Sequence, residues 1–564
     1  MQQKLSVQAY SNNDDATIII PNATFIKDCH GFAIFRKRKG ETDLEAEPLL
    51  TSVGFEGDPH TPEEMRPSTQ WPIQKYMWSD YFVKTGDEIC YKVIPMINTP
   101  NGLVKDMERA SEWSAWLTIG NSPGNEAYFN RGLVSSQFVS RRLANVPDKD
   151  RSKELSNILA DEKSPLKQFM GGNLLAALYS LLETIAETKT LKVYGALYEC
   201  NEPGLIRRLN KIGRRANIIL ANGAFSEDNN DPEKESADLL TKVNLTRRIV
   251  GTPHFAHNKF LVITQTTPDK VETPIKVWTG STNWTTNGLH TQVNNAVVIN
   301  DTDVAKYYKE EWDEMLKDCD NEGKGLYGKD FKKFNGTVKQ NQANTIRTYF
   351  TPVGNQIDMD EADKYINAAT KGILFLMFKP GVITGAKTKS RLLYNTILEK
   401  AKDRNLLVNG VINADPGGKD YPTIAFLHKN KYQEGDMDVA LPASIADPFE
   451  FWTKEMGKKN VTIHSKVILI DPFSDNPVLI TGSHNMGGKA SKSNDDNLNL
   501  IIGNKELARA YAIHMTAVYH HYRWRFYRSA ETTLPKWSGN VKSDIWQKWY
   551  ATGEKAREIR FWTT

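Results

Sequence analysis

Two histidine–lysine pairs with identical spacing are the residues of this 564-residue chain best suited to chemistry on an anion. His257 precedes Lys259 and His464 precedes Lys466, with one residue between the members of each pair. Residues two apart on an extended segment point to the same face, so an imidazole and an ammonium can meet one bound anion. Each pair therefore predicts half of a phosphate site.

The same order of polar residues follows each pair. A Gly-Ser-Thr-Asn segment and an asparagine cluster follow the first, and a Gly-Ser-His-Asn segment and an Asn/Asp cluster follow the second. The interval to the next candidate hydrogen-bonding residue is 11 positions in both copies, from Asn283 to Asn294 and from Asn485 to Asp496. Equal spacing in two copies indicates an internal repeat. The chain therefore carries the same half-site twice.

These residue types match the needs of phosphodiester cleavage. Attack on phosphorus builds negative charge on the equatorial oxygens, so the site needs fixed cations and hydrogen-bond donors. The two lysines supply the cations. The donors are the amides of Asn283 and Asn485 and the hydroxyls of Ser281 and Ser483. The two imidazoles must act in opposite protonation states, one as nucleophile and one as acid, and they titrate as a coupled pair.

The paired HxK(x)4D and GSxN patterns resemble the signatures of the phospholipase D superfamily, over roughly residues 127–528. The resemblance implies that the two halves pack face to face around one active site. It implies that one histidine attacks phosphorus to form a phosphohistidine, that the other protonates the leaving alcohol, and that no metal or other cofactor is needed. By this analogy, His257 is expected to be the nucleophile and His464 the acid.

The first copy departs from the superfamily pattern. Thr264 stands where the pattern has an aspartate, which the second copy keeps as Asp471. The later hydrogen-bonding position is Asn294 in the first copy and Asp496 in the second. An asparagine orients an imidazole but does not stabilise its cation as a carboxylate does. We therefore expect a chemically asymmetric site, supported by these residues and by both serines, and this asymmetry leaves either histidine open as the nucleophile.

Two further histidines lie close to the motifs. His254 stands shortly before the first pair and reads as a loop residue. His484 lies inside the second GSxN segment, so its backbone is at the site and its side chain is a candidate to line the pocket.

Strand and helix patterns alternate through residues 127–330 and 340–530, which predicts two α/β lobes. We expect two pseudo-symmetric phospholipase D-like α/β/α lobes packed face to face. A small all-β sandwich should precede them at residues 1–120, with strands at Gly31–Arg36, Tyr81–Val83 and Ile89–Pro95. These strands resemble a fibronectin type III-like module. Residues 531–564 form a Trp-rich tail, expected to pack on the body; its tryptophans are also candidates for a lipid interface.

Composition restricts the class of protein. Hydrophobic content of 40% and charged content of 25% are typical of a globular chain. No apolar run approaches the ~20 residues that cross a bilayer, and the amino terminus lacks a signal sequence. The protein is therefore expected to be soluble, either internal or secreted after loss of a signal, and monomeric. A net charge of +4 is too small to indicate a nucleic-acid surface.

Three substrate hypotheses follow. A phospholipase D acting on glycerophospholipid headgroups is favoured by the near-neutral charge and by the aromatic insertion Phe449–Trp452, a candidate contact with a membrane surface. A nuclease acting on DNA or RNA is the alternative, suggested by the segment Gly280–Trp284 and by the basic helix expected at Arg207–Arg215. A non-catalytic phosphate-binding relative is the third possibility.

Overall fold

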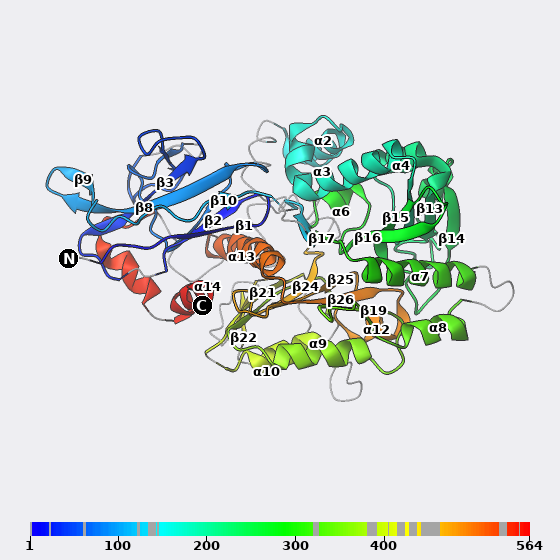
Figure 1. Cartoon of the computed structure of the whole chain (residues 1–564). Coiled ribbons are helices and arrows are strands. Elements are labelled where there is room, and N and C mark those ends of the chain that lie inside the picture. Colours follow the sequence, from blue (N-terminus) through cyan, green and yellow to red (C-terminus); the bar gives the residue numbers. More distant parts are fainter. Residues whose placement is uncertain are drawn as a thin grey trace.

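The computed structural model contains an N-terminal β domain, two α/β lobes and a C-terminal segment that packs back on the β domain and the second lobe (Figure 1). The structure describes residues 3–21, 24–59, 64–120, 124–132, 143, 146–319, 326–380, 392–403, 405–413, 424–427, 437–440, 463–528, 539–551 and 553–563. The Phe449–Trp452 insertion and Trp537 lie outside these residues.

A seven-stranded sheet forms the first lobe, in the order β11-β17-β16-β15-β12-β13-β14. The strands β12, β13 and β14 are parallel to one another, and the remaining pairs are antiparallel. The bounds are β11 (Glu126–Phe129), β12 (Leu191–Leu197), β13 (Ala216–Ala221), β14 (Asn244–Arg248), β15 (Lys259–Thr266), β16 (Glu272–Gly280) and β17 (Asn295–Ile299).

The second lobe repeats this topology. Its sheet runs β18-β19-β26-β25-β24-β20-β21-β23-β22, so the six strands from β19 to β21 match the first six of the other lobe in order and direction. The bounds are β18 (Lys339–Gln340), β19 (Ile346–Phe350), β20 (Gly372–Met377), β21 (Leu407–Ile412), β22 (Ile424–Leu427), β23 (Met437–Ala440), β24 (Lys466–Ile470), β25 (Val478–Gly482) and β26 (Asn497–Ile502).

Helices cover both faces of each sheet. The outer face of the first sheet packs on α3 (Pro165–Glu187) and α4 (Pro203–Ile212), and that of the second on α9 (Ile357–Asn367) and α10 (Leu393–Lys400). Further helices are α2 (Asp148–Ala160), α5 (Lys234–Leu239), α6 (Thr286–His290), α8 (Lys329–Asn335) and α12 (Gly488–Ser493). The expected pair of α/β lobes is confirmed.

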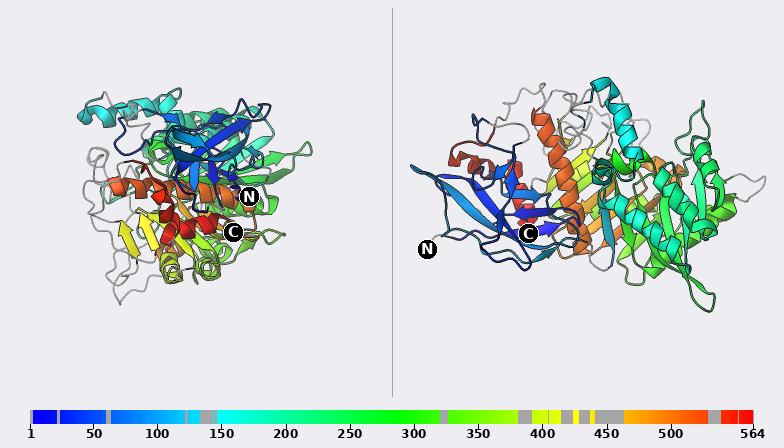
Figure 2. Two further views of the ribbon diagram at one scale, coloured as in Figure 1. Left: turned by 90° about the vertical axis from the view of Figure 1, so that its left-hand side faces the viewer. Right: turned by 90° about the horizontal axis from the view of Figure 1, so that it is seen from above.

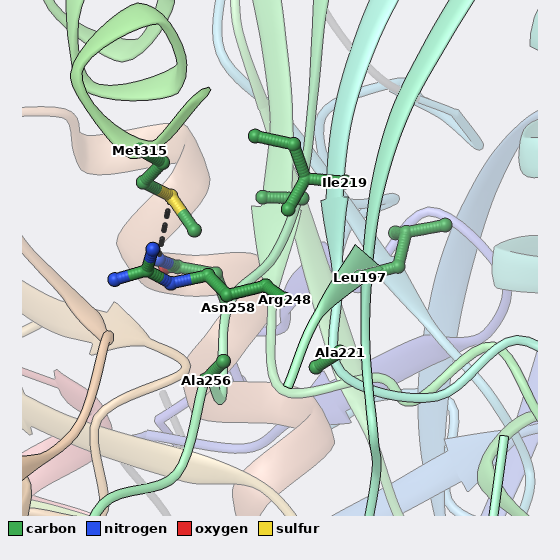
Figure 3. Close-up of a pocket in the computed structure, with 8 residues that line it drawn as sticks. Leu197, Ile219, Ala221, Arg248, Ala256, Asn258 and Met315 are labelled. Atoms are coloured by element: carbon green, nitrogen blue, oxygen red, sulfur yellow. Dashed lines mark hydrogen bonds between the residues drawn. The ribbon is translucent and has the colours of Figure 1, made fainter. Parts of the chain in front are cut away.

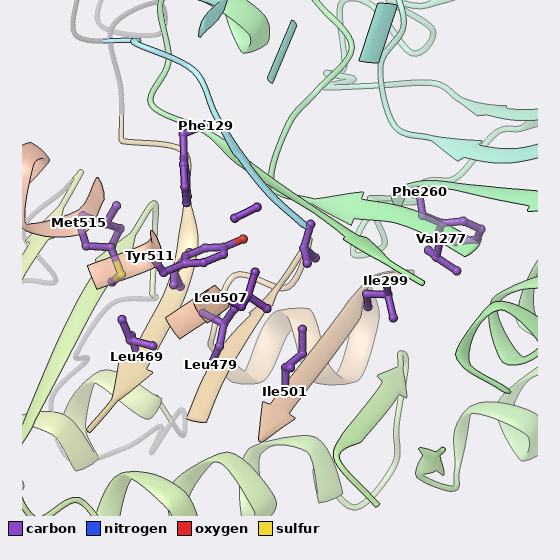
Figure 4. Packing of buried hydrophobic residues seen from close by; sticks show 14 of the residues in the cluster. Phe129, Phe260, Val277, Ile299, Leu469, Leu479, Ile501, Leu507, Tyr511 and Met515 are labelled. Carbon is purple, nitrogen blue, oxygen red and sulfur yellow. The ribbon is translucent and has the colours of Figure 1, made fainter. Parts of the chain in front are cut away.

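The largest hydrophobic cluster lies between the two sheets, where it joins the lobes. α7 (Thr302–Cys319) and α13 (Lys505–Arg528) pack there against residues of both sheets (Figures 1 and 4). Tyr511 of α13, for example, lies between Phe129 of one lobe and Leu479 of the other (Figure 4). Burying this surface stabilises the lobe–lobe contact by roughly 25 cal/mol per Å² of apolar area, so the lobes form one body.

The N-terminal domain is all-β, as expected. One sheet contains β1 (Gln8–Ser11), β2 (Ala16–Ile19) and β7 (Met77–Asp80). The other contains β3 (Cys29–Arg38), β4 (Glu47–Pro48), β8 (Glu88–Thr99), β9 (Gly102–Lys105) and β10 (Leu117–Thr118), and a separate pair joins β5 (Leu50–Thr51) to β6 (Arg66–Pro67). The strand expected at Tyr81–Val83 is wrong, because the Asp80 carboxylate accepts from the Phe82 amide and turns the chain there.

The described part of the tail, η3 (Asp544–Tyr550) and α14 (Gly553–Thr563), contacts two parts of the molecule (Figure 2). Trp546 is buried in the core of the β domain, where its indole N–H donates to the Cys29 carbonyl at 2.9 Å. Trp562 is buried beside Phe473 of the second lobe. Trp549, in contrast, is 45% exposed.

One described helix, α3, is long and apolar enough to cross a membrane by length and composition alone. The same test is passed by the core helix of a soluble protein, and α3 buries its leucines against the first sheet and α4. Its helical path is interrupted at Gly172, which has a φ of 55°. A side chain at this position would meet the Phe129 carbonyl at 2.7 Å, so glycine is needed for this close approach.

Candidate active site

The two histidine–lysine pairs lie at the amino-terminal ends of corresponding strands, β15 and β24. The segment that leads into each pair crosses to the other lobe. Phe255 forms a parallel bridge with Asn494, and Ile463 forms one with Val293. The polar cluster of each lobe is therefore held beside the histidine of the opposite lobe.

The first histidine is held by a carboxylate of the second lobe. His257 Nδ1 lies 2.8 Å from Asp496 Oδ1, and both side chains are buried. Because a carboxylate only accepts, Nδ1 carries the proton and Nε2 keeps a free lone pair. The expectation that the first histidine lacks an acidic companion is wrong, since the partner comes from the second copy.

The second histidine is held by neutral acceptors of the first lobe. His464 Nδ1 lies 3.0 Å from both Asn294 Oδ1 and the Ser281 carbonyl oxygen. Both partners are acceptors, since the Asn294 amide nitrogen donates to the Gly288 carbonyl oxygen at 2.8 Å, so this Nδ1 is protonated as well. The site is asymmetric as the sequence predicts, but the carboxylate stands behind His257 and the amide behind His464.

The two serines fix these partner residues. Ser281 Oγ donates to Asn294 Oδ1 and Ser483 Oγ donates to Asp496 Oδ1, each at 2.7 Å over a separation of 13 residues. Both serines are fully buried. We therefore assign them to orienting the residues that hold the histidines, rather than to direct donation to a substrate.

The two lysines occupy matching positions. Lys259 Nζ donates to the His257 carbonyl oxygen and Lys466 Nζ to that of His464, each at 2.6 Å. Burial lowers the pKa of Lys259 to about 7, although Asp496 opposes the shift. Burial and the charge of Lys259 also hold the pKa of Lys466 well below its usual value. Both ammonium groups thus gain stabilisation when an anion enters the site.

Both histidines are neutral in the free protein. Burial and the charge of Lys259 lower the pKa of His257 to about 4. Burial and the charges of both lysines hold the pKa of His464 well below its usual value. Burial opposes ionisation of Asp496, but His257 and its hydrogen bond hold the pKa of this carboxyl below the usual range.

The asparagines of the GSxN segments differ in their surroundings. Asn283 Nδ2 donates to Glu199 Oε2 at 2.5 Å, which leaves one N–H of this amide for another acceptor. The side-chain oxygens of Asn283 and Asn485 are buried and have no hydrogen-bond partner among the described residues. The expected role of the two amides as donors to a bound phosphate stays a prediction.

Sequence reasoning missed the aromatic rings beside the two pairs. Tyr198 lies 4.8 Å from the His257 ring, and Phe378 lies 4.7 Å from the His464 ring. Each ring also faces the neighbouring lysine, at 4.8 Å and 5.0 Å from ring centroid to Nζ. A signal was present, because each aromatic residue directly follows a buried strand that pairs with the strand of the lysine.

The residues after these rings carry opposite charges. Glu199 follows Tyr198, and the exposed Lys379 follows Phe378. Burial and the nearby Glu233 raise the pKa of Glu199 to about 7, although Lys259 opposes the shift. The two ends of the candidate site therefore differ in charge as well as in the partners of their histidines.

Among the described residues, neither Asp471 nor its counterpart Thr264 forms a hydrogen bond with His257 or His464. The Asp471 carboxylate accepts from the backbone N–H groups of residues 370–372 at 2.7–2.8 Å. Thr264 Oγ1 donates to Glu272 at 2.7 Å on the neighbouring strand. These residues support the sheets that carry the site.

The neighbouring histidines are structural. His254 stacks on Tyr327 and contacts the Ser493 carbonyl at 2.7 Å. His484 is fully buried, with Nε2 3.1 Å from Asp358 Oδ2, so the expectation that it lines the pocket is wrong. The described residues contain no group of three or more His, Cys, Asp or Glu side chains arranged to hold a metal ion.

This arrangement, two α/β lobes with one histidine–lysine half-site each, defines a phospholipase D-like protein. The family described as cardiolipin synthase, PLD-like domain, matches residues 182–316 and 363–518, which together make up about half of the chain. The chain belongs to this family. A comparison of the chain with curated proteins found no match.

Three solved structures show distant similarity. Phosphatidylserine synthase from Haemophilus influenzae Rd KW20 is 11% identical, with a TM-score of 0.39, over 61% of this chain and 84% of its own. A yeast tyrosyl-DNA phosphodiesterase mutant is 12% identical, with a TM-score of 0.32, over 58% and 89%. Polyphosphate kinase from Porphyromonas gingivalis is 9% identical, with a TM-score of 0.38, over 60% of this chain. The match spans 44% of that kinase's length.

Proposed function

We propose that this protein is a metal-independent phosphodiesterase that works through a phosphohistidine, and that it is a phospholipase D cleaving glycerophospholipid headgroups. The observation that carries the proposal is the exchange of partners between lobes, which anchors Nδ1 of both histidines. Nε2 of each ring is then the nitrogen available to a phosphodiester between the two lysines. No cofactor takes part in the proposed reaction.

The proposed reaction has two steps. His257 Nε2 attacks phosphorus, the bond from phosphorus to the leaving oxygen breaks, and His464 gives its Nε2 proton to that oxygen. Water then gives a proton to His464 and attacks phosphorus, the phosphorus–nitrogen bond breaks, and His257 is released. An alcohol in place of water gives transfer instead of hydrolysis. The two lysines and two asparagine amides stabilise the charge on the equatorial oxygens.

The partners of the two histidines support this assignment of roles. A nucleophilic imidazole becomes cationic when it bonds phosphorus, and the Asp496 carboxylate stabilises that charge on His257. An acid must give up its proton, and the neutral amide behind His464 stabilises the imidazolium less. An incoming phosphodiester anion raises the pKa of His464 and so charges it for the first step.

The surroundings of the basic helix favour a lipid over a nucleic-acid substrate. Arg207 and Arg208 both contact Glu162, and Lys211 contacts Glu183. Arg214 and Arg215 donate to backbone carbonyls. These cations are already engaged within the protein, so they do not form a free track for successive phosphates. Above pH 7, where Glu199 is ionised, its carboxylate would also repel a second phosphate on the first-lobe side of the site.

We further propose peripheral contact with a membrane surface as the route to a phospholipid, and a monomer as the working form. We also propose that the N-terminal domain is a fibronectin type III-like module. Trp546 of the tail lies in its core, and Tyr10 of β1 lies 5.5 Å from Phe473 of the second lobe, which supports a role in holding the second lobe and tail together.

One panel assay tests the proposed function. Purified protein is given phosphatidylcholine vesicles, cardiolipin vesicles, single-stranded DNA and duplex DNA, each with EDTA and over a series of salt concentrations. We expect headgroup release from a phospholipid in EDTA, with no cleavage of either DNA. DNA cleavage that falls steeply with salt would support the nuclease alternative. Loss of all activity in EDTA would contradict the metal-independent reaction.

A further inference from the structure

Arg248 is a fully buried arginine that joins the two lobes behind the active site. It is the last residue of β14. Its side chain lies beside Asn258, which is the residue between His257 and Lys259 in the sequence (Figure 3). Arg248 Nε lies 2.6 Å from Asp495 Oδ2 of the second lobe. Its Nη2 lies 2.9 Å from Asp318 Oδ2 of α7. One guanidinium thus links β14, α7 and the opposite lobe.

Asp495 is fastened to the first lobe by its backbone as well. Its N–H donates to the Phe255 carbonyl oxygen at 2.9 Å, and its own carbonyl oxygen accepts from the His257 N–H at 2.9 Å. The next residue, Asp496, holds the imidazole of His257. The ion pair with Arg248 therefore fixes the segment from which the carboxylate reaches the nucleophile.

The internal repeat supplies a comparison within the same chain. Val293 precedes Asn294 as Asp495 precedes Asp496, and the Val293 carbonyl oxygen accepts from the His464 N–H at 2.9 Å. This position is apolar in the first copy, which shows that the crossing segment is held there without a buried charge. Both copies hold the next residue in the same way, because Asn130 Oδ1 accepts from the Asn294 N–H at 2.8 Å and Thr351 Oγ1 accepts from the Asp496 N–H at 3.0 Å. The buried ion pair is therefore an addition confined to the copy that serves His257.

Packing alone does not account for this addition. Replacing a buried ion pair by apolar side chains of similar volume is often neutral or stabilising, because the desolvation of both charges offsets their attraction. The ion pair instead fixes the orientation of the Asp495 side chain, because a guanidinium binds a carboxylate in a defined plane.

We propose that Arg248 is a positioning residue for the reaction, which acts through Asp495 to aim the Asp496 carboxylate at His257 across the lobe boundary. This inference rests on the proposed function, in which His257 is the nucleophile. It predicts that Arg248 affects the chemical step and leaves substrate binding unchanged.

Four variants test the proposal on a phosphodiester that the wild-type protein cleaves: Arg248→Met, Asp495→Val, the double variant and Asp495→Asn. Each apolar single variant leaves the partner's charge buried, so we expect a lower unfolding midpoint. The double variant, which copies the apolar solution of the first half at Asp495, should regain part of the midpoint; Asp318 loses its cation but keeps the backbone N–H donors of residues 327 and 328. Its kcat should stay about 10- to 100-fold below wild type with KM unchanged, because the carboxylate is no longer aimed. Asp495→Asn keeps an acceptor for Arg248 and should stay within about threefold of wild type.

A matched control is Arg247→Met. Arg247 is the neighbouring residue on β14, but it pairs with Asp231 at 2.6 Å and, among the described residues, forms no hydrogen bond or ion pair with His257, Lys259 or Asp496, so kcat should not change. A double variant with the wild-type kcat would overturn the proposal and leave a purely structural role.

A second readout does not depend on turnover. The Nδ1 proton of His257, identified by its loss in His257→Asn, should give a downfield proton NMR signal because a carboxylate accepts it. We expect this signal to move upfield or broaden in the double variant and to persist in Arg247→Met. An unchanged signal in the double variant would overturn the positioning role. Absence of wild-type turnover on every phosphodiester, with the expected NMR result, would instead count against the proposed function alone.

Discussion

His257 and Asp496 form a hydrogen bond of 2.8 Å, from Nδ1 to Oδ1, although they belong to different lobes. The reciprocal contact joins His464 to Asn294 at 3.0 Å. Neither half of the chain therefore contains a complete site, because each imidazole takes its orientation from the other half. The exchange also makes the two histidines chemically different.

Replacing the carboxylate partner of His257 by an amide, and the amide partner of His464 by a carboxylate, should affect kcat differently. We expect Asp496→Asn to lower kcat by at least about 10-fold, because the cation that forms on His257 loses its carboxylate. Asn294→Asp should reduce kcat less and move the alkaline limb of the kcat–pH profile upward, since a carboxylate raises the pKa of His464. The pH dependence of kcat measured for both variants checks this. Equal losses in the two variants, with unshifted profiles, would contradict the assigned roles.

Anion affinity should fall at alkaline pH. Burial lowers the pKa of Lys259 to about 7, so this lysine loses its charge above neutrality when no anion is bound. We expect the inhibition constant of sulfate, which stays a dianion throughout, to rise by at least about 10-fold between pH 7 and pH 9. Lys259→Arg keeps a charged side chain over this range and should flatten the dependence. A wild-type inhibition constant that is flat from pH 6 to pH 9 would show that Lys259 remains charged.

Acid should destabilise the fold through buried neutral histidines. Burial lowers the pKa of His514, which stacks on Phe129, to about 3. The unfolded chain binds a proton near pH 6.5 and the native protein does not, so stability falls as the pH drops from about 6.5 toward 3. At pH 5 this one histidine should cost about 2 kcal/mol.

Denaturant unfolding at pH 7 and pH 5 measures this cost. In His514→Phe, which keeps an aromatic ring against Phe129, the difference between the two pH values should shrink by about 2 kcal/mol. Met515→Leu is the matched control on the same helix, and it should leave the pH dependence unchanged. The same pH dependence in His514→Phe as in the wild type would refute the prediction.

The basic helix should be dispensable for catalysis. Arg207 and Lys211 contact Glu162 and Glu183 at the surface, and exposed ion pairs of this kind contribute little to stability. We expect Arg207→Ala with Lys211→Ala to leave kcat/KM on a phospholipid unchanged and to give no change in DNA binding. A large loss of DNA binding in this variant would instead identify the helix as a nucleic-acid contact.

The sequence predicted the parts of the site that repeat. Two pairs, two GSxN segments and equal spacing indicated that His257 and His464 work together, and buried β-branched runs indicated the strands that carry them. The exchange of Asp496 and Asn294 could not be read from spacing, because it depends on how the segments before each histidine cross between lobes. Tyr198, Glu199 and Arg248 were missed since each reaches the site by strand pairing or a long side chain.

The expectation for His484 failed for a related reason. Its position inside a GSxN segment indicated proximity to the site, but Asp358 of α9 turns the side chain into the second lobe. Local spacing places a backbone near a site, whereas the partner that decides where a side chain points comes from elsewhere in the chain.

Single-turnover trapping with His257→Asn and His464→Asn tests the central claim most directly. Each variant is mixed with a phosphodiester that has a phosphorus label and a good leaving group, then quenched in alkali, in which phosphohistidine survives. The account predicts a labelled protein for His464→Asn, because His257 still attacks and an activated leaving group needs no acid, and no label for His257→Asn. A label on His257→Asn and none on His464→Asn would contradict it.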